Sequence, residues 1–346
     1  MPRFKSFDIL RVVSVLLVLL VHVSAQWTEK AVPGSAESTF ALACNILAFT
    51  GVALFVMLSG ALALSPLKED KGVLYILKHR TLKYFLIYFI WKALYFAAGL
   101  ISAGRAGDPL AWKEDVILAL FKKPGEYHLW FLPMLGIIFL LVPIIKKGCE
   151  KKENCLLFIS VFFIFGIFLP NLFLFDFPFK YLLMDLAGLF DFSVFTGYAG
   201  YFVLGHYIFS FWNEEKRSGK DQILILIAAA ILFAFSVLAA ATQSFKDGAP
   251  CYAFSTPMST QVFFIAAAVF AFFSRPLKAE IPVILPRSSF IVYLIHPFVL
   301  EFILSSGLVK TDMSAFAGIP LMLVLLALIS FALAILYNII IGSKRF

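Results

Sequence analysis

Arg11 and His22 are two ionisable residues that stand eleven positions apart in a long apolar segment. In an α-helix this spacing places both side chains on one face, about 16.5 Å apart along the axis. An imidazole can exchange a proton or act as a nucleophile, and a guanidinium can bind phosphate or stabilise an oxyanion. The pair is therefore a candidate catalytic site. The alternative is that Arg11 extends toward lipid headgroups and that His22 bonds to a neighbouring helix.

Lys92 and His128 are the next polar residues found at or within apolar segments. Lys92 lies in the middle of such a segment, where a charge is costly and usually faces the interior of a helix bundle. It either pairs within the bundle or contacts a substrate. His128 is followed closely by Trp130, and aromatic residues of this kind are common in the interfacial belt of membrane proteins. Both readings stay open for each residue.

His296 and Glu301 lie in a late apolar segment. Five helical positions separate them by about 140° around the axis, so one helix face cannot present both. His296 is the stronger candidate for a functional residue. Glu301 is a weaker candidate, on the side where an acceptor substrate would bind. His206, near the end of another apolar segment, is expected to be structural.

The amino-acid composition indicates whether these residues lie in a soluble or in a membrane protein. The 346 residues are 62% hydrophobic and only 14% charged, and they include 41 Phe. Soluble proteins average about 25% charged residues, so a soluble enzyme and a disordered chain are excluded. The net charge of +8 comes from scattered Lys and Arg rather than a basic face, so we expect no nucleic-acid partner. The chain is expected to be an all-α integral membrane protein.

Ten apolar stretches approach the length of about 20 residues that a membrane-spanning helix needs. We expect spans near 7–27, 40–64, 84–104, 128–145, 155–174, 188–210, 222–242, 259–274, 288–305 and 318–341. The first resembles a secretory signal, but Arg11 interrupts it and nine spans follow, so we expect it to be retained. The loops are short, and the whole chain, 1–346, is expected to form a single domain.

The distribution of Lys and Arg predicts the orientation of these spans. If the N-terminus is cytoplasmic, twenty basic residues fall on the cytoplasmic side and eight outside, with Lys92 inside a span. Cytoplasmic loops of membrane proteins carry such an excess. Both termini are therefore expected to be cytoplasmic. The four cysteines have no metal-binding or redox spacing, and we expect no metal.

Five stretches, in order along the chain, resemble the integral-membrane acyltransferase family 3. They are Asp8–Arg11 with His22 after ten residues, Phe55–Gly60, Lys78–Lys83, Tyr127–Leu132 and Tyr293–His296. The resemblance extends over about residues 7–300, and the family also has ten spans with cytoplasmic termini. The run Lys122-Lys123-Pro124 before Tyr127 is similar to the subgroup that O-acetylates surface polysaccharides such as enterobacterial common antigen. One departure is Lys83, where the family often has an arginine with a bidentate contact to phosphate.

The resemblance implies roles for these residues. His22 and Arg11 would be catalytic, with His22 acting either as general base or as covalent acyl carrier. The anionic end of acetyl-CoA or another acyl-CoA would be bound by four basic residues, namely Lys78, Arg80, Lys83 and Arg11. The remaining candidates for substrate contact or structural support are Ser59, Lys92, His128, Trp130, Tyr293, His296 and Glu301.

Two functions remain. The first is an O-acyltransferase, most simply an O-acetyltransferase, which moves an acyl group from cytoplasmic acyl-CoA to a surface glycan or a polyprenyl-linked saccharide. The resemblance implies a multi-pass protein of a bacterial-type cytoplasmic membrane. The alternative is a transporter of a lipid-linked sugar or small solute, with Arg11, His22 and Lys92 along its path. Transporters often contain inverted repeats, and the sequence shows no repeat. The oligomeric state does not follow from the sequence.

Overall fold

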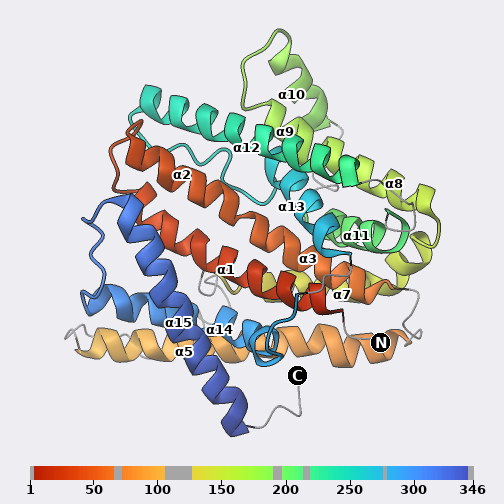
Figure 1. The fold of residues 1–346 in the computed structure, drawn as a ribbon. Coiled ribbons are helices and arrows are strands. Elements are labelled where there is room, and N and C mark those ends of the chain that lie inside the picture. Colours follow the sequence, from red (N-terminus) through yellow and green to blue (C-terminus); the bar gives the residue numbers. More distant parts are fainter. Residues whose placement is uncertain are drawn as a thin grey trace. The chain divides into compact units, whose positions relative to one another are not determined.

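The computed structural model describes residues 4–65, 72–105, 127–189, 197–212, 219–275 and 279–341. Every regular element in these ranges is a helix, which confirms the all-α expectation for this part of the chain (Figure 1). The first eight elements are α1 Lys5–Thr28, α2 Ala36–Ala48, α3 Thr50–Ala63, α4 Val73–Ile76, η1 Leu77–Thr81, α5 Leu82–Arg105, α7 Phe131–Gly148 and α8 Lys152–Val161. The remaining nine are η2 Phe162–Phe168, α9 Leu169–Leu172, α10 Lys180–Leu189, α11 Ala199–Tyr207, η4 Ile208–Trp212, α12 Gly219–Asp247, α13 Thr260–Phe273, α14 Ile284–Ser305 and α15 Ala315–Ile341. The elements labelled η are π-helical turns.

Seven helices in the described ranges are long and apolar enough to cross a membrane. They are Lys5–Thr28, Ala36–Ala63, Phe131–Gly148, Lys152–Leu172, Ile223–Asp247, Ile284–Ser305 and Ala315–Ile340. Each corresponds to one of the ten expected spans. The expected span 259–274 is the shorter apolar helix α13, and the span 84–104 falls within α5. The expected span 188–210 lies partly outside the described residues. The helix α10 was not expected from the sequence.

The chain divides into two compact units, which are treated separately. The larger unit comprises Met1–Ser65 and Lys151–Phe346, and the smaller unit comprises Pro66–Glu150. The single domain expected for 1–346 stays a prediction.

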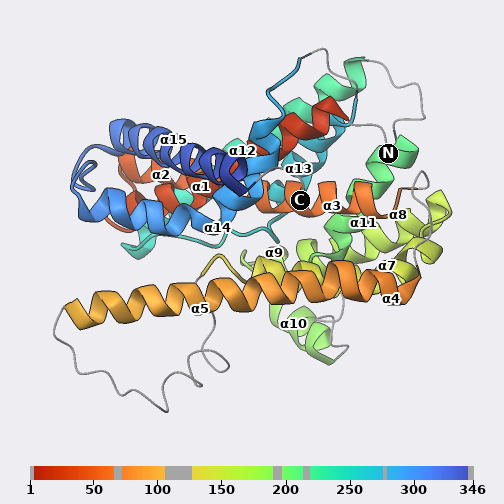
Figure 2. The ribbon, with the colours of Figure 1, turned by 90° about the horizontal axis from the view of Figure 1, so that it is seen from below.

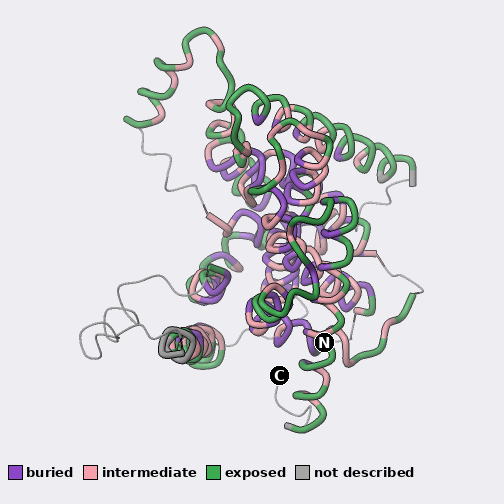
Figure 3. The backbone as a smooth tube through the Cα atoms, turned by 90° about the vertical axis from the view of Figure 1, so that its left-hand side faces the viewer, coloured by how far each residue is buried: buried purple, intermediate pink, exposed green. Residues whose placement is uncertain are grey.

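In the larger unit, burial separates inner from outer helices. In the apolar windows of α1 and α14, 56% of residues are buried, and in that of α2 and α3 the share is 67%. The corresponding share is 22% for α12 and 28% for α15. Figure 3 shows this difference as purple segments inside the bundle and green segments on outer helices. Lipid tails are as apolar as Leu, so exposed Leu and Phe on outer helices carry no penalty in a membrane.

The close crossing of α3 and α11 depends on two glycines. A Cβ atom added to Gly60 would clash with the carbonyl oxygen of Phe202, and one added to Gly205 would clash with that of Met57. Small residues let membrane helices approach until their backbones touch. The stretch Phe55–Gly60, one of the five that resemble the acyltransferase family, therefore ends in a glycine that the packing of α3 against α11 requires.

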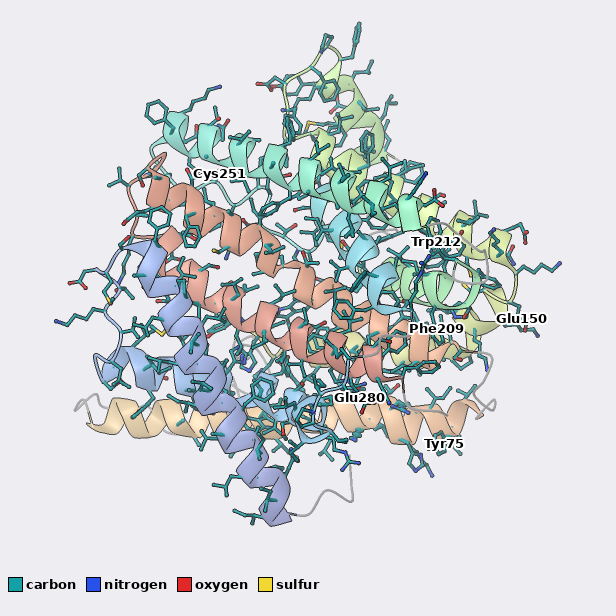
Figure 4. The ribbon with its side chains drawn as sticks, viewed as in Figure 1. Tyr75, Glu150, Phe209, Trp212, Cys251 and Glu280 are labelled. Atoms are coloured by element: carbon teal, nitrogen blue, oxygen red, sulfur yellow. The ribbon has the colours of Figure 1, made fainter. Side chains whose placement is uncertain are left out.

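Side chains from several elements fix helix α1. At its start, the ring of Phe7 packs 5.2 Å from that of Phe209, which Figure 4 labels, and Lys5 pairs with the labelled Glu280. At its end, Trp27 Nε1 donates a 2.9 Å hydrogen bond to the carbonyl of Met313. These contacts hold both ends of the helix that carries Arg11 and His22.

In the smaller unit, α4, η1 and α5 follow one another without a break, as Figure 2 shows. Helix α7 packs against this rod, with the rings of Tyr84 and Phe139 stacked at 5.5 Å and 9°. Gly136 leaves room for Phe85, whose ring would lie 3.2 Å from an added Cβ atom. The π-helical turn η1 is of interest because such turns occur frequently at functional sites.

Candidate active site

Two histidines from opposite ends of the sequence meet in the larger unit. His22 lies on α1 and His296 on α14, and their rings stack with centroids 5.1 Å apart and planes at 26°. His296 is completely buried, and His22 is partly buried. We call these two residues the imidazole pair. Polar side chains inside a membrane protein are costly and often mark a functional site, so the meeting of two imidazoles makes this place the first candidate.

The backbone of α14 holds the ring of His296. Its Nδ1 lies 2.7 Å from the carbonyl oxygen of Tyr293, one turn earlier in the helix. The ring of Tyr293 is itself buried, and its centroid lies 6.3 Å from that of His296. The late stretch Tyr293–His296 thus supplies both a side chain of the pair and the group that orients it.

Helix α2 supports the turn of α1 that carries His22. The amide nitrogen of Asn45 donates to Ser24 Oγ at 3.0 Å and to the carbonyl of Val21 at 3.3 Å. Asn45 is buried, and buried polar groups are stable only when they are hydrogen-bonded. This contact fixes the residues on either side of His22. Nothing in the sequence singled out Asn45, since an isolated amide in an apolar run carries no motif.

Arg11 lies on the same helix and forms an ion pair one turn back along it. Its Nη1 is 3.8 Å from Asp8 Oδ1, and its side chain is 34% exposed. Since α1 is one continuous helix, the eleven-residue spacing places Arg11 on the face of His22. The partly exposed guanidinium is charged at every physiological pH and suits binding of an anion.

The smaller unit carries three of the predicted donor-binding cations close together in sequence. Lys78 and Arg80 lie in η1, and Lys83 lies in the first turn of α5. Lys78 and Lys83 are exposed, while the guanidinium carbon of Arg80 stands 5.6 Å from the ring centre of Phe139. We call Lys78, Arg80 and Lys83 the basic turn. Arg11 belongs to the other unit, so its predicted joint role with the basic turn stays a prediction.

Lys92 and His128 are both buried, and both contact aromatic rings of the smaller unit. Lys92 Nζ lies 5.6 Å from the ring centre of Tyr88, a cation–π distance. The ring of His128 meets that of Tyr95 edge-on at 5.3 Å. Tyr95 is three positions after Lys92, so the two side chains share one face of α5. These contacts fit a structural role and leave a substrate role untested.

Three further predicted residues, Ser59, Glu301 and Trp130, are either exposed or in contact with residues close to them in sequence. The hydroxyl of Ser59 donates to the carbonyl of Phe55 at 2.9 Å within α3. Glu301 is exposed on α14, and Trp130 is exposed with its ring 6.2 Å from that of Phe131. Ser59 and Glu301 belong to the larger unit, and no contact recorded among the described residues brings either of them to the imidazole pair. Trp130 belongs to the smaller unit, so its predicted role stays a prediction. Among the described residues, no group of three His, Cys, Asp or Glu could hold a metal ion.

A family model described as an acyltransferase domain matches residues 4–340 of this chain. The chain belongs to this acyltransferase family. The match covers both units and all five stretches that suggested it. The family and the seven apolar helices identify a multi-pass membrane acyltransferase.

Curated relatives of this acyltransferase include proteins from Staphylococcus aureus strains MSSA476 and MW2. Each is named "Probable poly-beta-1,6-N-acetyl-D-glucosamine export protein" and is 24% identical over 324 residues, which are 91% of this chain and 88% of the relative. The protein of strain MRSA252 has the same name, identity and coverage. No solved structure matches the chain.

Proposed function

We propose that this acyltransferase is an O-acetyltransferase of an envelope polysaccharide or its polyprenyl-linked precursor, with cytoplasmic acetyl-CoA as donor. The observation that carries the proposal is the imidazole pair, two stacked rings on α1 and α14 of an acyltransferase-family chain that could act as base or nucleophile. His22 would take the proton of the acceptor hydroxyl or carry the acyl group. Arg11, on the same helix face, would stabilise the developing oxyanion or bind donor phosphate.

The basic turn is proposed to bind the phosphates of the donor. Three cations within six residues, two of them exposed, offer charge-assisted hydrogen bonds to phosphate oxygens. Lys83 contributes charge without the planar fork of an arginine, so Arg80 is expected to make the stronger contact.

The polysaccharide acceptor has two supports. The relatives' printed name refers to an N-acetylglucosamine polymer, and the run around Tyr127 is similar to that of surface-polysaccharide O-acetyltransferases. The relatives' name points to a β-1,6-linked polymer as acceptor, and the run around Tyr127 points to a polymer of the common-antigen type. Both polymers present free hydroxyl groups.

The proposed topology has ten spans in a bacterial-type cytoplasmic membrane, with both termini cytoplasmic. It adds α5, the region 188–210 and α13 to the seven long apolar helices. Its support is the excess of basic residues in alternate loops. A reporter fused after Lys152 should then read cytoplasmic and one after Lys246 should read external.

Export of a polysaccharide or lipid-linked sugar is the second candidate function. One observation favours it, namely the word "export" in the relatives' name. In that case Arg11, His22 and Lys92 would line a path for the glycan, and no acyl donor would be consumed.

One experiment separates these functions. Purified protein in lipid vesicles is supplied with acetyl-labelled acetyl-CoA and a β-1,6-linked N-acetylglucosamine oligosaccharide, and in a second series with polyprenyl-linked saccharides from a bacterial membrane extract. Label in the glycan and release of CoA thiol would support the transferase. Glycan movement across the vesicle without thiol release in either series would overturn it in favour of export.

A further inference from the structure

Helix α14 contains Pro297 immediately after His296. Proline has no backbone N–H, and its ring displaces the carbonyl four residues earlier. That carbonyl belongs to Tyr293. The hydrogen bond that a regular helix would form from residue 297 to Tyr293 is therefore impossible here.

The side chain of His296 takes over this position. Its Nδ1 lies 2.7 Å from the Tyr293 carbonyl oxygen. A carbonyl oxygen can only accept a hydrogen bond, so the proton must be on Nδ1. In the neutral ring the lone pair is then on Nε2. Pro297 and Tyr293 together select one tautomer of His296, in which Nε2 is the basic nitrogen.

This oriented base stacks on the ring of His22 at 5.1 Å. Two imidazolium rings at this distance within buried helices would repel each other strongly, so the pair favours having at most one charged ring. The site thus contains two nitrogen bases, and the backbone carbonyl of Tyr293 orients one of them, His296.

We propose that His296 is the base that deprotonates the acceptor hydroxyl, while His22 carries the acyl group. The proposal rests on the transferase function proposed above and assigns its two chemical tasks to two rings. A single imidazole that holds the acyl group cannot at the same time accept the acceptor's proton at that nitrogen.

The reaction then has two balanced steps. In the first, a nitrogen of His22 bonds to the thioester carbon, the carbon–sulfur bond breaks, and the N–H proton of His22 passes to the sulfur, which leaves as CoA thiol. In the second, the acceptor oxygen bonds to the acyl carbon as Nε2 of His296 takes its proton. The carbon–nitrogen bond to His22 breaks, and that proton returns to the ring of His22.

The first test replaces His296 and separates the two steps. In His296→Ala and His296→Gln, acetyl transfer to the oligosaccharide should fall by about 100-fold or more, the usual cost of losing a general base. Mixing acetyl-CoA with enzyme should still release close to one CoA thiol per protein in a single turnover. His22→Ala should release none.

The second test leaves both histidines in place. Pro297→Ala restores an N–H that competes for the Tyr293 carbonyl, so the tautomer of His296 is no longer selected. The turnover number should fall about fivefold, as expected for the loss of one orienting hydrogen bond, with the Michaelis constant for the donor unchanged. The ¹⁵N spectrum of histidine-labelled protein should show protonated Nδ1 for His296 in wild type and a mixture in Pro297→Ala.

The matched control is His206→Ala. His206 is also buried in the larger unit, and its Nδ1 also has a local partner, Ser210 Oγ at 3.2 Å. This variant should keep acetyl transfer within about threefold of wild type. If the His296 variants transferred acetyl groups like wild type, or lost thiol release together with transfer, the division of roles would be wrong. Absence of transfer by wild type would instead remove the proposed function itself.

Discussion

The imidazole pair and the basic turn are both proposed to act on a charged acyl donor, and they differ in charge and in burial. The pair consists of two rings that can be neutral, with His296 completely buried between helices of the larger unit. The basic turn consists of two lysines and an arginine at the start of α5 in the smaller unit, and both lysines are exposed. Partial burial and the neighbouring Arg80 lower the pKa of the Lys83 amine. Burying a permanent charge is far more costly than burying a neutral imidazole.

This difference fits the proposed division of labour, in which the imidazole pair carries out the chemical step and the basic turn binds the donor. Bond making needs a group that can change its protonation state in a site shielded from water, and a buried imidazole meets this requirement. Binding of phosphates needs charge that does not change, and it works at an exposed position. Variants of the pair should therefore affect turnover, and variants of the basic turn should affect donor affinity.

The largest effect is expected for His22→Ala. Loss of a base or covalent carrier lowers the rate by about 10²-fold or more, while the other contacts of α1, such as Trp27 to Met313, are kept. Acetylation of the glycan in membranes with matched protein levels measures this effect, with His206→Ala as the control. Near-normal acetylation by His22→Ala would show that the imidazole pair does not carry out the chemical step.

A smaller effect is expected for Arg80→Ala. Loss of one charge-assisted hydrogen bond to phosphate, about 1.5–3 kcal/mol, should raise the Michaelis constant for acetyl-CoA by roughly ten- to a hundredfold. The turnover number at saturating donor should stay near that of wild type. Initial rates over a range of donor concentrations separate the two constants, and a lower turnover number with an unchanged Michaelis constant would contradict the binding role.

The salt concentration should affect donor binding by the basic turn. Exposed charges are screened over about 8 Å at physiological ionic strength, so the Michaelis constant for the donor should rise severalfold between 50 and 500 mM KCl, roughly as screening increases. The triple variant of Lys78, Arg80 and Lys83 to alanine should lose most of this salt dependence. An equal salt dependence in wild type and the triple variant would mean that these cations serve only the membrane topology.

The smallest effect on activity is expected for Asn45→Ala, which should act mainly on stability. This change removes the two hydrogen bonds that Asn45 makes to α1. The expected loss is about 1–3 kcal/mol of stability, because Ser24 and the Val21 carbonyl remain in buried surroundings. Thermal unfolding in detergent, measured beside the exposed substitution Thr242→Ala, would reveal it. An unchanged unfolding temperature would show that α2 does not position the turn of His22.

Much of the fold could be predicted from hydrophobic length alone. The helix limits 7–27 and 318–341 lie close to Lys5–Thr28 and Ala315–Ile341, because a continuous apolar run in a membrane can satisfy its backbone only as a helix. The exposed helix α10 could not be predicted in this way, since ten residues are too few to span a membrane.

The candidate site was only partly predictable. Periodicity placed Arg11 and His22 on one face, but it could not bring His22 to His296, since 274 positions separate them. Pairing across such a distance depends on the packing of α1 against α14. The role proposed for Pro297 and the contacts of Asn45 were also missed. The sequence His296-Pro297 does contain the signal, a side-chain donor beside a residue that cannot donate from its backbone.

The most direct test of the account measures donor binding and turnover together in His22→Ala and Arg80→Ala. Calorimetry with acetyl-CoA gives the dissociation constant, and label transfer to the oligosaccharide gives the turnover number. We predict that His22→Ala binds the donor like wild type without turning over, and that Arg80→Ala turns over normally at saturation with weakened binding. Normal turnover by His22→Ala, or a dissociation constant unaffected in Arg80→Ala, would contradict the separation of chemistry from binding.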